Sequence, residues 1–423
     1  MPQAPRPVIT GLGFVTPIGT SRETVEDGLR QGRHGLSPVQ FLGNPAIPVR
    51  LAGQVAGFDV SSQNYRDWQW PSEYTIERET LRTLAPHGVF ALCALDQALR
   101  EAGLRESVRG DDTTALFCAS SGSAMLLHHN LAQMYAVRGE RGNPLGVVSS
   151  IAGTLNFTLA AHFGVTGAVC GFVSACASSS HALGYACDEI RLGRMRRVLV
   201  VGAEEHNAET ILPFAAMRAL SLESDPLKAS CPFDKGRSGF VGSGGAVALV
   251  LEDEAEADRR GARIQARLLG WGQSADGHSV SMSLPDGSGL RRAMERALAN
   301  AGIEPRAVDY VNAHATSTPV GDAAEAAALK AVFGTSGARP VVSSTKGLTG
   351  HPLSMSGVME AAFCVLALEG AFMPGNAHLR DPDPACDGLI LPVETLNRRP
   401  SVVLNNSCGF GGSNVCHLLG KGE

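Results

Sequence analysis

Cys176 is the residue whose setting best fits chemistry in this sequence. It lies in the run Val173–Ser180, between the apolar stretch 169–173 and a stretch with helical spacing. We therefore predict a short buried strand, a turn at Cys176 and a helix that ends near Gly193. Free N–H groups and the dipole at a helix start stabilise a thiolate, which is the nucleophilic form of cysteine. The alternative is a buried structural thiol.

Three later stretches share another pattern, a buried strand that ends in a polar, glycine-bearing turn. They are 310–322 with His314, 341–352 with Lys346 and His351, and 402–414 with Phe410. Strand ends in open α/β sheets are where ligand sites form. Two neutral imidazoles can donate N–H groups to an oxygen that gains negative charge, so His314 and His351 fit such a role beside Cys176. Taken singly, each histidine is more simply a loop residue, and Lys346 a solvated charge.

The remaining sequence alternates strand and helix patterns. Strands are expected within 7–19 and at 113–120, 197–203, 246–252, 264–269, 308–312, 340–344 and 401–405, and helices at 21–30, 84–102, 125–134, 290–301, 323–333 and 357–369. Strands without polar alternation, interleaved with helices, predict an α/β architecture with a covered sheet. The charged stretch 253–261 marks a seam, so we expect two halves, 1–255 and 256–423, without any repeat in their letters.

Composition excludes several classes of function. The chain has 423 residues, 44% of them hydrophobic and 18% charged, and a formal net charge of −5. This balance favours neither nucleic acid nor an anionic membrane surface as a partner. We predict no transmembrane helix, because the longest apolar candidate, 361–373, is short and contains Glu369. The N-terminal residues lack the apolar core of a signal peptide, so we expect a cytoplasmic protein.

Cysteine and glycine spacing argue against bound cofactors. The ten cysteines form no CxxC pair and no cluster with histidine, so no metal site is expected and reduced thiols are the natural state. The glycine-rich turn after the first strand has Thr16 where a dinucleotide-binding motif needs its third glycine. We therefore expect no bound nucleotide.

Taken together, these stretches resemble the β-ketoacyl-acyl-carrier-protein synthases, and among them the elongating branch with a Cys-His-His triad. The resemblance rests on Ala-Cys-Ala-Ser at 175–178, Pro-Phe-Asp-Lys-Gly-Arg-Ser-Gly-Phe at 232–240, Asn-Ala-His-Ala-Thr-Ser-Thr-Pro at 312–319, Ser-Thr-Lys-Gly-Leu-Thr-Gly-His at 344–351 and Gly-Phe-Gly-Gly-Ser-Asn at 409–414. It extends from 9–13 to Asn414, over almost the whole chain. It implies a thiolase-like fold, in which two similar halves form an αβαβα five-layer sandwich, and a dimer.

The resemblance also implies a reaction. An acyl group passes from an acyl carrier protein to Cys176, and a malonyl carrier protein then loses CO2 and condenses with it. His314 and His351 stabilise the enolate. The backbone N–H groups of Cys176 and Phe410 form an oxyanion hole for the tetrahedral intermediate.

Supporting roles follow from the same resemblance. Phe410 gates the acyl pocket within a turn that Gly409 and Gly411 make possible. Lys346 orders the site, paired with Glu360. The threonines that bond the phosphopantetheine arm of the carrier protein are Thr316 and Thr318. The substrates arrive on that arm, so no other cofactor is implied.

The sequence departs from the family pattern at several positions around the site. They are Ser238 in Arg-Ser-Gly-Phe for a usual aspartate, Gly244 for a common acidic residue, Ser354-Met-Ser-Gly357 for Gly-Ala-Ala-Gly, and Cys408 for a frequent phenylalanine. These departures favour a specialised polyene or type II polyketide pathway over housekeeping fatty-acid elongation.

Two other functions are weighed against the condensing enzyme. A non-catalytic chain-length factor shares the fold but usually lacks the cysteine that this chain keeps. A thiolase needs a second cysteine acid, which has no matching motif here. The dimer could be with itself or with a related ketosynthase-like subunit. The basic cluster Arg191, Arg194, Arg196 and Arg197 is a candidate docking site for an acidic carrier protein, or else a solvated helix end.

Overall fold

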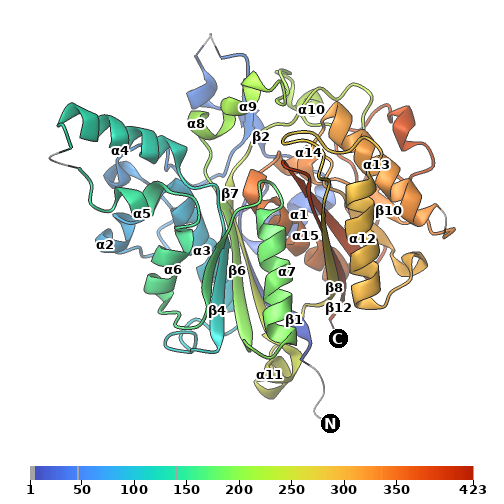
Figure 1. Cartoon of the computed structure of the whole chain (residues 1–423), viewed down its shortest axis with the longest axis horizontal. Coiled ribbons are helices and arrows are strands. Elements are labelled where there is room, and N and C mark those ends of the chain that lie inside the picture. Colours follow the sequence, from blue (N-terminus) through green and yellow to red (C-terminus); the bar gives the residue numbers. More distant parts are fainter. Residues whose placement is uncertain (1–4, 45–46, 140–141, 335, 423) are drawn as a thin grey trace.

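Two strand units with the same order form the frame of the molecule. The computed structural model describes residues 5–44, 47–139, 142–334 and 336–422, and ten strands of these residues make the orders β5-β4-β6-β7-β1 and β10-β9-β11-β12-β8 (Figure 1). Along the chain, both units use their third, second, fourth, fifth and first strand in that order. In each unit the first two pairings are parallel and the last two antiparallel. The duplication is therefore in the structure, where the sequence shows none.

Among the described strands, the two units pair with each other only between β1 and β8, through Val8 with Arg267 and Ile9 with Ala266. The strands of the first unit are β1 (Pro7–Val15), β4 (Thr114–Ala119), β5 (Val169–Phe172), β6 (Arg197–Glu204) and β7 (Gly245–Asp253). Those of the second are β8 (Ala266–Ala275), β9 (Tyr310–Asn312), β10 (Val341–Ser343), β11 (Val402–Gly409) and β12 (Ser413–Lys421). A small separate sheet pairs β2 (Leu36–Pro38) with β3 (Leu51–Gly53).

Helices make three layers around the two sheets. The central layer is α7 (Ser178–Arg191) and α15 (Ser356–Gly370), the first outer layer is α3 (Pro86–Glu101) and α6 (Leu155–Phe163), and the second outer layer is α12 (Ser288–Ala301) and α13 (Pro319–Phe333). The others are α1 (Arg22–Gln31), α2 (Arg78–Leu81), α4 (Ala124–Ala136), α5 (Gly146–Ser150), α8 (Ala208–Ile211), α9 (Pro213–Ala216), α10 (Pro226–Ala229), α11 (Glu254–Arg259) and α14 (Lys346–Thr349). The result is the five-layer αβαβα sandwich of the thiolase-like fold.

Strand β6 shows why these strands lack polar alternation. Val198 and Val200 point into the cluster shared with the central helices, whereas Leu199 and Val201 point into the cluster shared with α3. Both faces of the sheet are covered, so both sets of side chains are apolar.

Most predicted elements are present within a few residues, with two corrections. The strand before Cys176 is not buried: β5 is the edge strand of its unit, and Val169 and Cys170 are exposed. An apolar run does not distinguish a covered strand from an edge strand. The last strand, β12, was not predicted, and it forms a hairpin with β11 through the glycine turn at 410–412. The charged seam contains the short helix α11.

One helical segment of the described residues, Leu353–Gly370, is long and apolar enough to cross a membrane by length and composition. It begins earlier than the candidate 361–373 recognised in the sequence. Of this segment, 89% is buried inside the molecule. It lies between the two sheets as part of the central layer, the position of a core helix.

Candidate active site

Cys176 lies in a tight turn between β5 and α7. Ala175 has a φ of +51°, in the left-handed region that side chains rarely adopt. The hydroxyl of Ser178, the first residue of α7, accepts from the N–H of Ser174 at 2.8 Å and donates to the carbonyl of Ala175 at 2.6 Å. Helix α7 thus begins two residues after Cys176, close to where the sequence predicts it.

The environment of the Cys176 sulfur is electrostatically mixed. Burial raises the pKa of the thiol to about 12, whereas the charge of Lys346 and the backbone N–H groups of Cys176 and Phe410 act to lower it. The sequence predicted that the helix start would favour the thiolate. The N–H groups do act in that direction, but burial outweighs them, so the resting residue is a thiol.

Two imidazoles lie beside the thiol. His351 Nε2 is 3.1 Å from Cys176 Sγ, and the rings of His314 and His351 are nearly perpendicular with centroids 5.4 Å apart. Burial, and then the charge of Lys346, hold the pKa of both histidines well below the usual range. Both rings are therefore neutral at neutral pH, and each has one N–H to donate.

Lys346 lies behind these groups and pairs with Glu360, and both side chains are fully buried. Burial raises the pKa of the Glu360 carboxyl to about 7, and the lysine acts against that rise. Lys346 does not line the pocket. It acts on the thiol and both imidazoles through its charge.

Glu325 is a site residue that the sequence analysis missed. Its carboxylate accepts from the N–H groups of His314 at 3.0 Å and Ala315 at 2.7 Å, and from Asn406 Nδ2 at 3.0 Å. It thereby fixes the loop that carries His314. Burial raises its pKa. The sequence did contain a sign of this role, because Glu325 and Asp322 are acids one turn apart on the buried side of the alanine-rich helix α13.

The thiol of Cys176 and the rings of His314 and His351 open into one cavity of about 480 Å³. Of the residues singled out in the sequence, its lining includes Cys176, His314, Thr316, Thr318, His351, Cys408, Gly409 and Phe410. The hydroxyls of Thr316 and Thr318 are 3.2 Å apart. Residues of α9 and α13 contribute to its lining, and both helices lie in the upper part of Figure 1.

The glycine turn that follows β11 closes against the cysteine turn. A Cβ at Gly409 would lie 2.8 Å from the carbonyl oxygen of Ser174 and 3.2 Å from the nitrogen of Cys176, so only glycine allows this approach. Gly411 has a φ of +81° and its N–H bonds the Val280 carbonyl, away from the pocket lining. Phe410 packs near the ring of Phe214, with centroids 5.9 Å apart.

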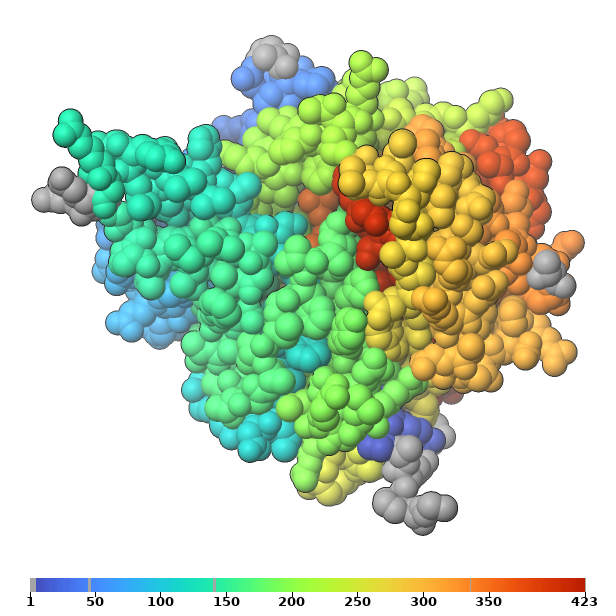
Figure 2. All heavy atoms as spheres, viewed as in Figure 1, coloured from blue at the N-terminus to red at the C-terminus, as the bar shows by residue number. Residues whose placement is uncertain are grey.

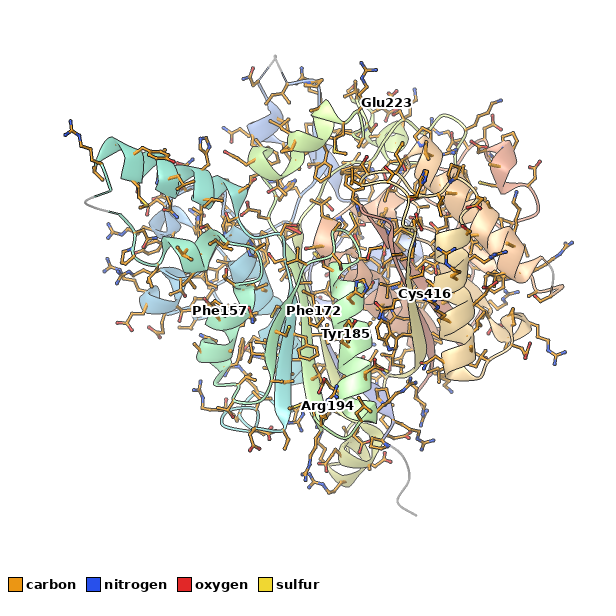
Figure 3. All side chains as sticks on the ribbon, viewed as in Figure 1. Phe157, Phe172, Tyr185, Arg194, Glu223 and Cys416 are labelled. Carbon is orange, nitrogen blue, oxygen red and sulfur yellow. The ribbon has the colours of Figure 1, made fainter. Side chains whose placement is uncertain are left out.

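The basic cluster at the end of α7 does not fit a carrier-protein dock. Arg194 pairs with Glu189, Arg197 with Asp111 and Glu252, and Arg196 lies 3.6 Å from Glu256, while Arg191 bonds Asn300 and the Leu269 carbonyl. Cys176 is at the other end of the same helix, and Arg194 lies at the lower end in Figure 3. Charge counted along the sequence could not reveal these internal pairs.

A buried nucleophile, two neutral imidazoles and two backbone N–H groups that favour the thiolate define a site for acyl transfer within a thiolase-like fold. Comparison with known proteins agrees. The profile described as "Beta-ketoacyl synthase, N-terminal domain" matches residues 6–257, and "Beta-ketoacyl synthase, C-terminal domain" matches 265–380. The chain belongs to the β-ketoacyl synthase family, whose members are acyltransferases that catalyse condensation.

Individual relatives cover the full chain. The sequence is 36% identical over 418 residues to "3-oxoacyl-[acyl-carrier-protein] synthase 1" of Haemophilus influenzae, covering 97% of each chain. The structure is similar to a β-ketoacyl synthase from Burkholderia phymatum, with a TM-score of 0.90, 29% identity and coverage of 99% and 100%. It is also similar to "The ishigamide ketosynthase/chain length factor", with a TM-score of 0.88, 29% identity and full coverage of both chains.

Proposed function

We propose that the chain is a β-ketoacyl-[acyl-carrier-protein] synthase in which Cys176 carries the acyl group and His314 and His351 drive the condensation. The observation that carries this proposal is the 3.1 Å contact between Cys176 Sγ and His351 Nε2, beside a second neutral imidazole in one pocket. A nucleophile next to two N–H donors is what the two half-reactions need. The name of the Haemophilus relative supports the same activity.

In the first half-reaction the Cys176 sulfur attacks the acyl thioester carbonyl. The new C–S bond forms, the bond to the carrier sulfur breaks, and the carrier leaves as a thiol with the proton that Cys176 loses. The charge of Lys346 favours the thiolate during attack. The N–H groups of Cys176 and Phe410 suit the oxyanion of the tetrahedral intermediate.

In the second half-reaction the malonyl carboxylate leaves as CO2. The electrons of the broken C–C bond form an enolate, whose oxygen accepts hydrogen bonds from the N–H groups of His314 and His351. The enolate carbon then attacks the acyl carbonyl on Cys176, and the Cys176 sulfur leaves. Because both imidazoles are neutral and buried, they stabilise the enolate charge without any prior change in their own charge.

We propose an acyl carrier protein as the partner that delivers both substrates. Thr316 and Thr318 line the pocket and present hydroxyls to a phosphopantetheine arm. That arm belongs to the substrate, and we propose no cofactor of the enzyme's own. We propose the cytoplasm as its compartment, where the ten cysteines would stay reduced.

A second ketosynthase-like chain is proposed on the face that carries β5. Exposed apolar side chains gather on α4, α5, α6, β5, the turn after β5, and α7: Leu127, Leu131, Met134, Tyr135, Val147, Phe157, Val169, Val173 and Tyr185. Phe157, Phe172 and Tyr185 follow one another across this face in Figure 3, and Figure 2 shows the same side as a surface. A group of neighbouring exposed apolar side chains is typical of a protein–protein interface. The partner is a second copy or a chain-length-factor-like subunit.

We propose a specialised polyene or type II polyketide pathway, with housekeeping fatty-acid elongation as the alternative. Cys408, a departure from the family pattern, lines the pocket. The similarity to the ishigamide ketosynthase supports the first pathway and the name of the Haemophilus relative the second. A non-catalytic chain-length factor is disfavoured, because the nucleophile and both histidines are present.

Intact-protein mass spectrometry tests the proposal. Purified enzyme is mixed with a panel of acyl carrier proteins carrying acyl groups of different length and oxidation, and then with malonyl carrier protein. We expect an acyl adduct on the wild type, none on Cys176→Ala, and a carrier-bound product two carbons longer. The preferred acyl group distinguishes the pathways. A folded wild type that takes no acyl group, alone or with a related subunit, would contradict the proposal.

A further inference from the structure

Several contacts that do not involve its second nitrogen hold the His351 ring in place. Its backbone N–H donates to the Val241 carbonyl at 2.7 Å, and its carbonyl accepts from the N–H of Ser243 at 3.2 Å. The ring of Phe240 packs edge-on against it with centroids 5.2 Å apart. The location of Nε2 beside Cys176 therefore depends on backbone pairing and ring packing.

The second nitrogen, Nδ1, makes a separate contact with Ser356 Oγ at 3.1 Å. Ser356 is the first residue of α15 and is fully buried, and its side chain does not cap the helix. Within the described residues this contact is the hydroxyl's only hydrogen bond. By contrast, His314 Nδ1 is buried without a partner in the same part of the structure.

The turn that presents Ser356 is anchored independently. Both the N–H and the hydroxyl of Ser354 bond the carboxylate of Glu204, which also accepts from the Ser121 hydroxyl at 2.9 Å. The usual family pattern, Gly-Ala-Ala-Gly, has no hydroxyl at position 356.

A neutral imidazole has one N–H, and the bond at one nitrogen decides which nitrogen carries it. His351 is neutral, and the nitrogen that faces the reaction is Nε2. We propose that Ser356 is a positioning residue for the His351 proton: its hydroxyl donates to Nδ1 and thereby keeps the hydrogen on Nε2. This inference rests on the proposed function, in which Nε2–H donates to the enolate oxygen.

The two half-reactions differ in their need for this tautomer. Acylation of Cys176 proceeds with either form, because Nε2–H stabilises the thiolate and a bare Nε2 accepts the proton of the thiol. Enolate stabilisation needs Nε2–H, because a bare nitrogen would face the oxyanion with a lone pair. Loss of the hydroxyl therefore slows condensation selectively.

Ser356→Ala tests this in single-turnover experiments, with Ser354→Ala as the matched control on the same turn. We expect Ser356→Ala to form acyl-enzyme within about three-fold of the wild-type rate, and its purified acyl-enzyme to condense with malonyl carrier protein about ten-fold more slowly, the effect of one lost hydrogen bond. Ser354→Ala should show no such selectivity. Equal losses in both half-reactions, or the same selectivity in Ser354→Ala, would overturn the proposal.

A second measurement does not depend on activity. The nitrogen-15 spectrum of histidine-labelled protein, with His351 assigned by its absence in His351→Asn, reports which ring nitrogen carries the hydrogen. We expect Nε2–H in the wild type and a shift toward Nδ1–H in Ser356→Ala. An unchanged tautomer would overturn the proposal even if the wild type formed no acyl-enzyme, whereas a missing acyl-enzyme alone would contradict only the proposed function.

Discussion

The two halves of the molecule use one strand order for different chemistry. In the first half the third strand, β5, leads to Cys176 and then to α7. In the second half the third strand, β10, leads to Lys346 and His351 and then to α15. Both central helices begin with a serine, but Ser178 bonds the backbone of its turn whereas Ser356 bonds an imidazole. Each half thus places the start of a central helix at the site. The nucleophile belongs to the first half and the two hydrogen-bond donors belong to the second.

The same strands also differ at their outer edges. In the second half, the Val342 N–H donates to the Ile390 carbonyl at 2.9 Å, so the chain covers β10 itself. In the first half β5 is exposed, beside apolar side chains such as Val173, which is 64% exposed. An open apolar edge strand is a site for pairing with another chain. The proposed partner chain would therefore lie against the half that holds the nucleophile.

The largest expected effect comes from removing the nucleophile. Cys176→Ala should abolish the acyl adduct and all condensation, while release of CO2 from malonyl carrier protein continues, because the donors belong to the other half. Mass spectrometry follows the adduct and a CO2 assay follows decarboxylation. Loss of decarboxylation in a folded variant would show that the two halves do not divide the chemistry in this way.

Removing one donor from the second half should have the next largest effect. His314→Ala is expected to slow condensation by about 10²–10³, the usual cost of one oxyanion donor, with little change in acyl-adduct formation. His351→Ala should slow both steps, because His351 Nε2 also contacts the Cys176 sulfur. Rapid-quench assays of each half-reaction separate these outcomes. Identical profiles for the two variants would contradict the difference between the histidines.

The buried ion pair of the second half should control stability as well as rate. Lys346→Met leaves Glu360 buried without its partner, and loss of one member of such a pair costs about 3–5 kcal/mol. Adding Glu360→Met should recover most of that stability, measured by denaturant unfolding, but not the activity. Recovery of activity in the double variant would exclude a role for the lysine charge at Cys176 and the histidines.

The sequence was informative where chemistry depends on residue type and strand order. It indicated the α/β class, most elements and the positions that meet in the pocket, since Cys176, His314 and His351 each follow an apolar strand. The acids at 322 and 325 signalled a buried role on α13, but the sequence could not show that Glu325 bonds the His314 loop, because those contacts arise only in the folded chain. Nor could it show that β5 is an edge, because edge and buried strands share an apolar pattern and differ only in tertiary neighbours.

A substitution on the exposed edge strand β5 should have a smaller effect, which is measured separately as a change in oligomeric state. Val169→Lys on β5 should shift the protein from an assembly of twice 44.2 kDa, or from a pair with a related subunit, toward the monomer. Ile390→Lys is the matched control, because Ile390 is similarly exposed on the segment that covers β10. Light scattering after size exclusion measures both. Dissociation by Ile390→Lys alone would locate the interface on the other half.

The smallest effect is expected at the first residue of α7. Ser178→Ala removes two hydrogen bonds to the turn that holds Cys176 and should cost about 1–2 kcal/mol of stability. Acyl-adduct formation should slow about ten-fold while condensation of preformed acyl-enzyme changes little, the reverse of the pattern expected for Ser356→Ala. If both serine variants slowed the same half-reaction, the helix starts would not serve separate steps. Opposite patterns would mean that each half tunes its own step through the first side chain of its central helix.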